Sequence, residues 1–355
     1  MQKYIELLRE LMACRSVTRD VAAVNQAEAK MREFLEGNGI SCTVENIDGR
    51  EVVYATTGSG KVSDVLFNAH MDVVPPNSPD DHILRIEGNK LLGRGTDDCL
   101  GQAVGIAKML IDLKGKADVS AFFTADEETG GMTTLGMVNR GYTARKIAIV
   151  IDSSAYAVAI AQKGILVLRF TAKGVGGHSS VPWTKDNPID KLMDGYIRFR
   201  NAWPWHPSKE NQWLNSMTPC IVSAGNAENQ IPDVAELVVN IRYTAEQDEE
   251  TILKLARETT GLELTKARSC KPMYSDESSP AVIELKNAIQ AAFPDHKVGY
   301  TRMNGATDAR HLAKLGIPVA VIGFDGGGAH AANEWLDLEN SKQYIKLLED
   351  YVLKL

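Results

Sequence analysis

The sequence lacks several features that would point to particular classes of protein. It has no excess of basic residues, since 39 Lys and Arg stand against 46 Asp and Glu, so we expect no nucleic-acid partner. Its longest apolar runs, such as residues 147–151, are far too short to cross a bilayer. Charges at Lys3, Glu6 and Arg9 do not fit a signal peptide. Five cysteines without a CxxC pair predict no disulfide framework, so we expect a cytoplasmic protein without a membrane partner.

The chain has the composition of a globular protein that is large enough for two domains. It contains 355 residues, of which 44% are hydrophobic and 24% charged, and a domain averages roughly 150 residues. Apolar runs at residues 65–69, 119–125 and 147–152 predict strands that are buried on both faces. Residues 100–113 have helical spacing between the first two runs. This order predicts an α/β fold with a mostly parallel sheet flanked by helices.

The pattern changes after Lys163 and indicates an inserted α+β domain. The expected elements are a strand, a helix, two strands, a helix and a strand, over residues 164–174, 187–201, 220–224, 234–244, 248–260 and 262–269. A polar linker at residues 275–280 then returns the chain to a helix and an apolar strand. We therefore predict a discontinuous catalytic domain of residues 1–163 and 276–355, interrupted by a smaller domain of residues 164–275.

Polar side chains follow four of the predicted strands, directly for the first three and at the end of a glycine-rich loop for the strand of residues 319–324. They are His70 and Asp72, Glu127 and Glu128, Asp152, and His330. In open α/β sheets, ligands bind beyond the carboxyl ends of the strands, so these side chains are expected at one edge. Imidazole and carboxylate together form the mixed ligand set that zinc accepts. The sequence therefore predicts a metal site at this edge of the sheet.

Local spacing suggests roles for some of these residues. In a continued strand, His70 and Asp72 would point to the same face, and a carboxylate there can orient the imidazole. Glu127 and Glu128 would point opposite ways in extended chain, so either could bind metal while the other acts as general base. Two further carboxylates end the run GRGTDD just before a helix, at Asp97 and Asp98. Either could bridge two cations, and a carboxylate at a helix N-terminus is the alternative interpretation.

Eight motifs in a fixed order resemble one family. They are HMDVVP (70–75), GRGTDDCLG (93–101), DEETGG (126–131), Asp152, GVGGHSS (174–180), NQIP (229–232), NIRY (240–243) and GATDA (305–309). Together they resemble the co-catalytic zinc peptidase and deacylase family, which includes acetylornithine deacetylase, succinyl-diaminopimelate desuccinylase, aminoacylases and glutamate carboxypeptidase. The resemblance implies a zinc-exopeptidase-like catalytic domain with an inserted lid and dimerisation domain. Leu100 stands where the family usually has Lys, which leaves the subfamily open.

The resemblance implies a site for two divalent metal ions, zinc in the first place, with Co²⁺ or Mn²⁺ as alternatives. Asp98 would bridge both ions. His70 and Asp152 would complete one site, and Glu128 and His330 the other. The peptide bond that follows Asp98 is expected to be cis.

The resemblance also implies which residues act on the substrate. Glu127 would be the general base, and Asp72 would orient His70. His178 would assist catalysis from the inserted domain of a partner subunit, so a homodimer through that domain is expected. Arg242 would bind a substrate carboxylate, because its guanidinium makes bidentate hydrogen bonds. The other expected substrate contacts are Asn229, Thr307, Gly326, Gly327 and Gly328.

These observations predict a metal-dependent amidohydrolase that acts on a small-molecule substrate. It would cleave the amide bond of a small N-acyl amino acid, using a water held between the two cations and Glu127 as general base. A dipeptidase or carboxypeptidase of the same family is the first alternative. A catalytically silent protein that binds metal or ligand as a regulator is the second, and the intact Glu127 argues against it. A nucleotide-binding α/β protein is disfavoured, because neither GxGxxG after the first strand nor GxxxxGK[ST] is present.

Overall fold

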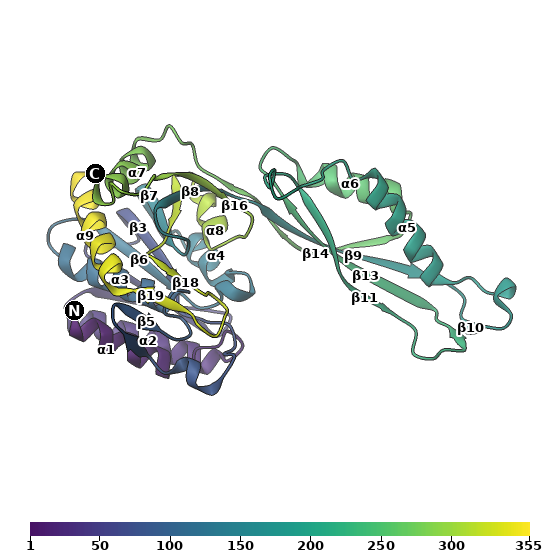
Figure 1. Ribbon diagram of the computed structural model, residues 1–355, viewed down its shortest axis with the longest axis horizontal. Helices are drawn as coiled ribbons and strands as arrows, with labels where there is room; N and C mark the ends of the chain where they lie inside the picture. The colour runs from purple at the N-terminus through teal and green to yellow at the C-terminus, as the bar shows by residue number, and fades with distance from the viewer. The chain divides into compact units, whose positions relative to one another are not determined.

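The computed structural model describes residues 1–355, and the chain divides into two compact units (Figure 1). The large unit contains Met1–Ala161, Tyr274–Arg302 and Thr307–Leu355. The inserted unit contains Gln162–Met273 and Met303–Ala306. None of the helices has the length and apolar composition that a membrane crossing requires.

A mixed nine-stranded sheet forms the centre of the large unit. Its path runs β1-β2-β6-β3-β7-β17-β8-β15, and β16 pairs with β8. The bounds are β1 Ser41–Ile47, β2 Arg50–Thr56, β3 Val62–His70, β6 Val119–Thr124, β7 Thr143–Ile151, β8 Ala157–Gln162, β15 Met273–Tyr274, β16 Gly299–Met303 and β17 Val319–Ile322. The four central strands β6, β3, β7 and β17 are parallel to one another. Their carboxyl ends therefore lie along one edge, as the sequence predicts.

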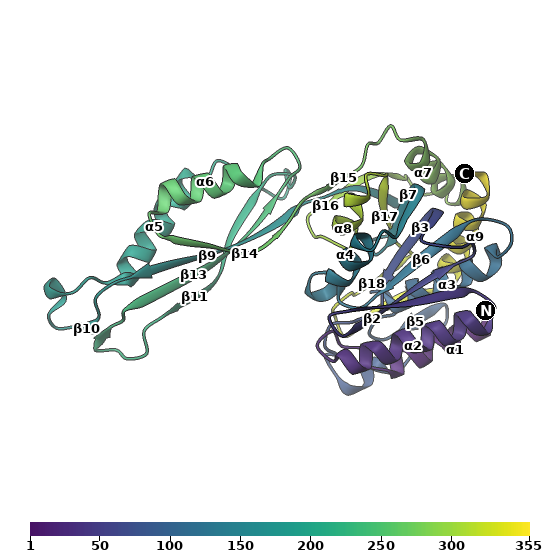
Figure 2. The same cartoon turned by 180° about the vertical axis from the view of Figure 1, so that it is seen from behind.

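Helices cover this sheet because its central strands are apolar on both faces. Five helices share one hydrophobic core with the sheet: α1 Gln2–Ala13, α2 Val21–Gly37, α3 Leu100–Leu113, α7 Pro280–Ala292 and α9 Leu338–Lys354. Two short helices, α4 Met132–Asn139 and α8 Ala309–Leu312, contact each other and the sheet, and Figure 2 shows α4 from behind. The α/β class with flanking helices is thus confirmed. Helix α9 was not predicted, although Asp337 caps its first turn and Tyr344, Leu348 and Tyr351 form a buried helical stripe.

A small second sheet of the large unit holds the glycine-rich loop after β17. Its order is β18-β19-β5-β4, with bounds β18 Gly326–Gly327, β19 Trp335–Asp337, β5 Lys90–Leu92 and β4 Arg85–Glu87. Gly326 pairs with Leu336, and Gly327 pairs with Trp335. The segment between them, which carries His330, is therefore closed at its base by a ladder.

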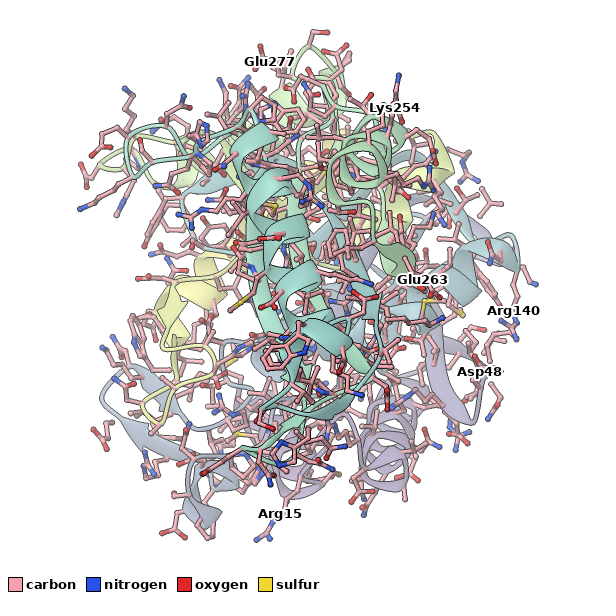
Figure 3. The ribbon with its side chains drawn as sticks, turned by 90° about the vertical axis from the view of Figure 1, so that its right-hand side faces the viewer. Arg15, Asp48, Arg140, Lys254, Glu263 and Glu277 are labelled. Carbon is pink, nitrogen blue, oxygen red and sulfur yellow. The ribbon has the colours of Figure 1, made fainter.

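The inserted unit is an antiparallel sheet covered on one face by two helices, in agreement with the predicted α+β domain. The sheet order is β11-β13-β9-β14, with bounds β11 Ser216–Ala224, β13 Val234–Tyr243, β9 Gly164–Lys173 and β14 Glu263–Cys270. Helices α5 Pro188–Ala202 and α6 Glu249–Thr260 pack on it around a separate core. Figure 3 looks onto these helices and labels Lys254 on α6 and Glu263 at the start of β14. A two-stranded ladder of β10 Gly177–His178 and β12 Gln230–Ile231 completes the unit.

Candidate functional site

The residues predicted as metal ligands are brought together by the carboxyl ends of the central strands. His70 is the last residue of β3, and Asp152 follows β7 directly. Glu128 lies in a short 3₁₀ helix shortly after β6. His330 lies in the loop between β18 and β19, and Asp98 lies just before α3. Candidate ligand atoms of His70, Asp98 and Glu128 lie within 4.8 Å of one another.

Asp98 lies between two histidines, with one carboxylate oxygen toward each. Its Oδ1 is 2.8 Å from Nε2 of His70, and its Oδ2 is 3.2 Å from Nε2 of His330. The same nitrogen of His330 is 3.2 Å from Oε1 of Glu128. A carboxylate that offers its two oxygens to two separate ligand groups is arranged to bridge two cations. The peptide bond between Asp98 and Cys99 is cis, as the resemblance implies.

The donor set also fits cations on electrostatic grounds. Burial raises the pKa of Asp152 well above its ordinary value, and the charge of Asp98 raises it further. Burial likewise raises the pKa of Glu128, and the charge of Asp98 raises it further. Buried carboxylates in such proximity are stable in ionised form only next to positive charge. Divalent cations among these carboxylate and imidazole ligands would supply it.

Asp72 orients His70 differently from the prediction. The backbone carbonyl of Asp72 lies 2.8 Å from Nδ1 of His70, whereas the nearest carboxylate oxygen is 3.4 Å away. The carboxylate instead accepts hydrogen bonds from the hydroxyl of Thr18 at 2.7 Å and from the backbone N–H groups of Glu127 and Glu128 at 3.1 and 3.3 Å. Asp72 therefore fixes the imidazole through its main chain and the acidic turn through its side chain. Thr18 was not identified from the sequence, because it lies 54 residues before Asp72 without a motif.

The side chains of Glu127 and Glu128 point in different directions, but strand alternation is not the reason. The chain forms a 3₁₀ turn at Glu127–Thr129, so the argument from extended chain was wrong. The turn directs Glu128 to His330 and Glu127 to Arg310, whose Nη2 is 3.3 Å from Oε1 of Glu127. Burial is the largest cause that raises the pKa of Glu127 to about 8, while the charges of His70 and Arg310 lower it.

Arg310 was missed in the sequence, although it directly follows the GATDA motif. It is buried on α8 and is the guanidinium that faces Glu127. Asp308 of the same motif accepts hydrogen bonds from the hydroxyl groups of Thr124 and Thr134 at 2.8 and 2.5 Å. These bonds tie α8 to the end of β6 and to α4, so the motif places a cation beside the predicted base. Thr307 is buried at the start of this helix, where its hydroxyl accepts from the Ala309 N–H at 3.2 Å.

Asp97, the competing bridge, lies against the glycine-rich loop. A Cβ atom added to Gly326 would lie 2.2 Å from Oδ1 of Asp97, so only glycine allows this close approach. Burial is the main cause that raises the pKa of Asp97 to about 7, followed by the charges of Glu334, Asp98 and Asp325. Gly327 of β18 pairs with Trp335 of β19, and Gly328 has a φ of +74°, which favours glycine.

The remaining predicted residues lie in the inserted unit, in two groups. His178 pairs with Gln230 across the β10–β12 ladder, and the carbonyl of Asn229 accepts the Ser179 N–H at 3.0 Å. Arg242 lies near the other end of the unit, eight residues along β13 from Val234, which is roughly 26 Å at the rise of a strand. The inserted unit therefore brings His178 and Asn229 together but keeps Arg242 apart from them.

A second cation accompanies Arg242 and was not identified from the sequence. Lys163 is 3% exposed, donates to the carbonyl of Gln212 at 2.6 Å, and lies 5.8 Å from the ring centre of Trp213. Burial lowers the pKa of Lys163, and the charge of Arg242 lowers it further. Two cations that destabilise each other in this way favour an anion between or beside them.

Known proteins resemble this chain in sequence. Residues 66–354 match the family described as Peptidase family M20/M25/M40. A probable succinyl-diaminopimelate desuccinylase of Staphylococcus aureus (strain MSSA476) is 24% identical over 352 residues, which cover 86% of each chain. The succinyl-diaminopimelate desuccinylase of Xylella fastidiosa (strain 9a5c) is 28% identical over 386 residues, which cover 99% of each chain.

Solved structures share the fold at lower identity. An M20 family metallo-carboxypeptidase, Sso-CP2 from Sulfolobus solfataricus, has a TM-score of 0.79 at 16% identity and covers 99% of both chains. Aminopeptidase PepT from Bacillus cereus ATCC 10987 has a TM-score of 0.78 at 15% identity, over 99% of this chain and 98% of that chain. The family match extends over most of the sequence and confirms the resemblance that the motifs indicate. The chain therefore belongs to peptidase family M20/M25/M40, a family of metal-dependent hydrolases.

Proposed function

We propose that this protein is a dinuclear zinc amidohydrolase that cleaves the amide bond of a small N-acyl amino acid. The observation that carries the proposal is Asp98, whose two carboxylate oxygens face two different histidines at 2.8 and 3.2 Å. His70 and Asp152 would hold one ion, and Glu128 and His330 the other, with Asp98 shared. Zinc accepts this combination of imidazole and carboxylate ligands, and Co²⁺ or Mn²⁺ could replace it.

Glu127 is the residue of this site suited to move protons. When bound, the two ions would polarise the amide carbonyl and increase the acidity of a water molecule. Glu127 would take the proton of the attacking water on its carboxylate and then deliver it to the leaving amine nitrogen. A pKa near neutral, here about 8, suits a group that must both accept and donate. Arg310, 3.3 Å away, would hold this carboxylate in place during both transfers.

The cations of the inserted unit support a substrate that carries a carboxylate. Arg242 would bind the carboxylate of the amino acid, and Lys163 would add a second positive charge beside it. The curated relatives at 24% and 28% identity are named as desuccinylases, which remove an acyl group. We therefore favour a deacylase over the alternatives, a dipeptidase or carboxypeptidase.

A homodimer through the inserted unit would complete the site. Along β13, Arg242 lies roughly 26 Å from the strand end near His178 and Asn229, further than a small substrate extends. One chain could then supply Arg242 while its partner supplies His178 to stabilise the developing oxyanion. The outer strand β11 has an unpaired edge with Ile221 and Val222 exposed by 61% and 72%, which suits pairing with a second copy.

A substrate panel tests the proposed function. Zinc-loaded protein would be assayed on N-acetyl amino acids, N-succinyl amino acids and dipeptides, with kcat/KM compared across the classes. The proposal expects the highest value for an N-acyl amino acid, and a dipeptide preferred over every N-acyl compound would instead establish the peptidase alternative. Protein that binds two ions but hydrolyses no member of the panel would favour the silent regulator.

A further inference from the structure

We propose that Glu334 is a positioning residue that fixes the bridging carboxylate of Asp98 and the loop of His330 in position relative to each other. Glu334 is 1% exposed. Its Oε1 accepts the backbone N–H groups of Gly95, Asp97 and Asp98 at 2.9, 3.0 and 3.0 Å. Three amides that converge on one oxygen fix the path of the chain up to the bridging residue. This inference rests on the proposed dinuclear site.

Glu334 also belongs to the loop that carries His330. That loop is closed at its base by the β18–β19 ladder, and the carbonyl of Glu334 accepts the Gly93 N–H at 3.0 Å. His330 itself has a φ of +65° and a side chain that is 54% exposed, so it lacks the support that a strand gives. The side chain and the carbonyl of Glu334 thus join the segment before Asp98 to the segment after His330.

The second oxygen of Glu334 forms a buried ion pair with Arg94. Nη1 of Arg94 lies 2.6 Å from Oε2, and both side chains are 1% exposed. With its amide turned so that the oxygen faces the donors, Asn77 accepts from Nη2 of Arg94 at 3.0 Å and from the Ala332 N–H at 3.2 Å. The pair therefore links the same two segments a second time. A pair of this kind could serve stability alone, so the test must separate stability from positioning.

The two predicted metal sites depend unequally on this arrangement. His70 and Asp152 end central parallel strands, which remain in place without Glu334. Asp98 and His330 lie in the two segments that Glu334 joins. Removing the acceptor at position 334 is therefore expected to weaken the ion held by Glu128 and His330 more than the ion held by His70 and Asp152. Support residues of this kind typically contribute about 10- to 100-fold to metal affinity.

Three variants separate the acceptor from the ion pair. Glu334→Gln keeps an oxygen that can accept the three amides but loses the negative charge. Arg94→Met removes the cation but keeps the acceptor. The double variant Arg94→Met with Glu334→Met removes both charges together, which avoids an unpaired buried charge, and also removes the acceptor. Glu236→Gln, in the more exposed Arg169–Glu236 pair of the inserted unit, is the matched control.

The measurements are metal content and magnetic coupling. Each protein would be titrated with Zn²⁺ against a chelating indicator, and the Mn²⁺-loaded form would be examined by electron paramagnetic resonance for coupling between the two ions. We expect the double variant to bind the second ion about 10- to 100-fold more weakly and to lose the coupling. The Gln and Arg94→Met variants should keep both ions and the coupling, whatever their melting temperatures.

Two results would overturn the proposal. One is a double variant that binds the second ion as tightly as Arg94→Met does. The other is a folded Glu334→Gln variant that has lost the second ion, and this arm decides the question even where the double variant does not fold. A wild-type protein that binds fewer than two ions would contradict the proposed function itself, and the wild-type titration shows this before any variant is compared.

Discussion

Replacement of Arg310 by Met should shift the pH dependence of catalysis. Nη2 of Arg310 lies 3.3 Å from Oε1 of Glu127, and the two side chains are 5% and 11% exposed. At an effective dielectric constant of about 20, two unit charges at this distance attract each other by about 5 kcal/mol. Because one pKa unit corresponds to about 1.4 kcal/mol, this attraction sets an upper limit of over three units on the change in the pKa of Glu127. We expect the loss of Arg310 to raise that pKa by at least about one unit.

The sign of the shift follows from the charges. The cation lowers the pKa of Glu127, so its loss raises that pKa and leaves the base protonated up to a higher pH. The acid limb of kcat/KM against pH should therefore move to higher pH, with activity recovered under alkaline conditions. Arg310→Lys, which keeps the charge, should move the limb less.

Metal content is the control for the Arg310 variants. Arg310 also donates to the backbone carbonyl of Glu127 at 3.4 Å, so its loss could disturb the turn that carries Glu128. A variant with unchanged metal stoichiometry excludes this explanation. An Arg310→Met enzyme whose acid limb coincides with that of the wild type would refute the electrostatic reasoning.

Four other predictions address the ligands, the base and the dimer. Glu127→Ala should retain two ions but lose about 10²- to 10⁴-fold in kcat, measured on the best substrate of the panel, and an unchanged kcat would exclude Glu127 as the base. His330→Ala should lower the metal stoichiometry by elemental analysis, and two tightly bound ions would show that His330 is no ligand. Equal amounts of inactive Glu127→Ala and His178→Ala protein, mixed and allowed to exchange subunits, should regain activity, which could not happen if each chain used its own His178. Val222→Lys should convert the proposed dimer to a monomer in size-exclusion chromatography, because it places a charge beside the exposed edge of β11, and an unaffected dimer would place the interface elsewhere.

The clustering of the candidate ligands could be predicted from the sequence because these residues have local signals. His70 and Asp152 end apolar strands, and Asp98 precedes a helix within a compact motif. Parallel strands bring such ends to one edge regardless of the connections between them. The local backbone conformation was harder to predict from the sequence. A 3₁₀ turn at Glu127–Thr129 replaces the extended chain that was assumed there.

The supporting residues could not be predicted, because their partners are distant in the sequence. Arg310 is 183 residues from Glu127, and Glu334 is 236 residues from Asp98. The sequence around a charged residue does not indicate whether that residue is paired. Burial in the folded chain does indicate this, since a buried charge requires a partner. Arg310 and Glu334 are 6% and 1% exposed, which marks both as paired once the fold is known. The candidate metal ligands of such a site can therefore be predicted from local motifs, while the groups that adjust their position and pKa can be identified only from the tertiary structure.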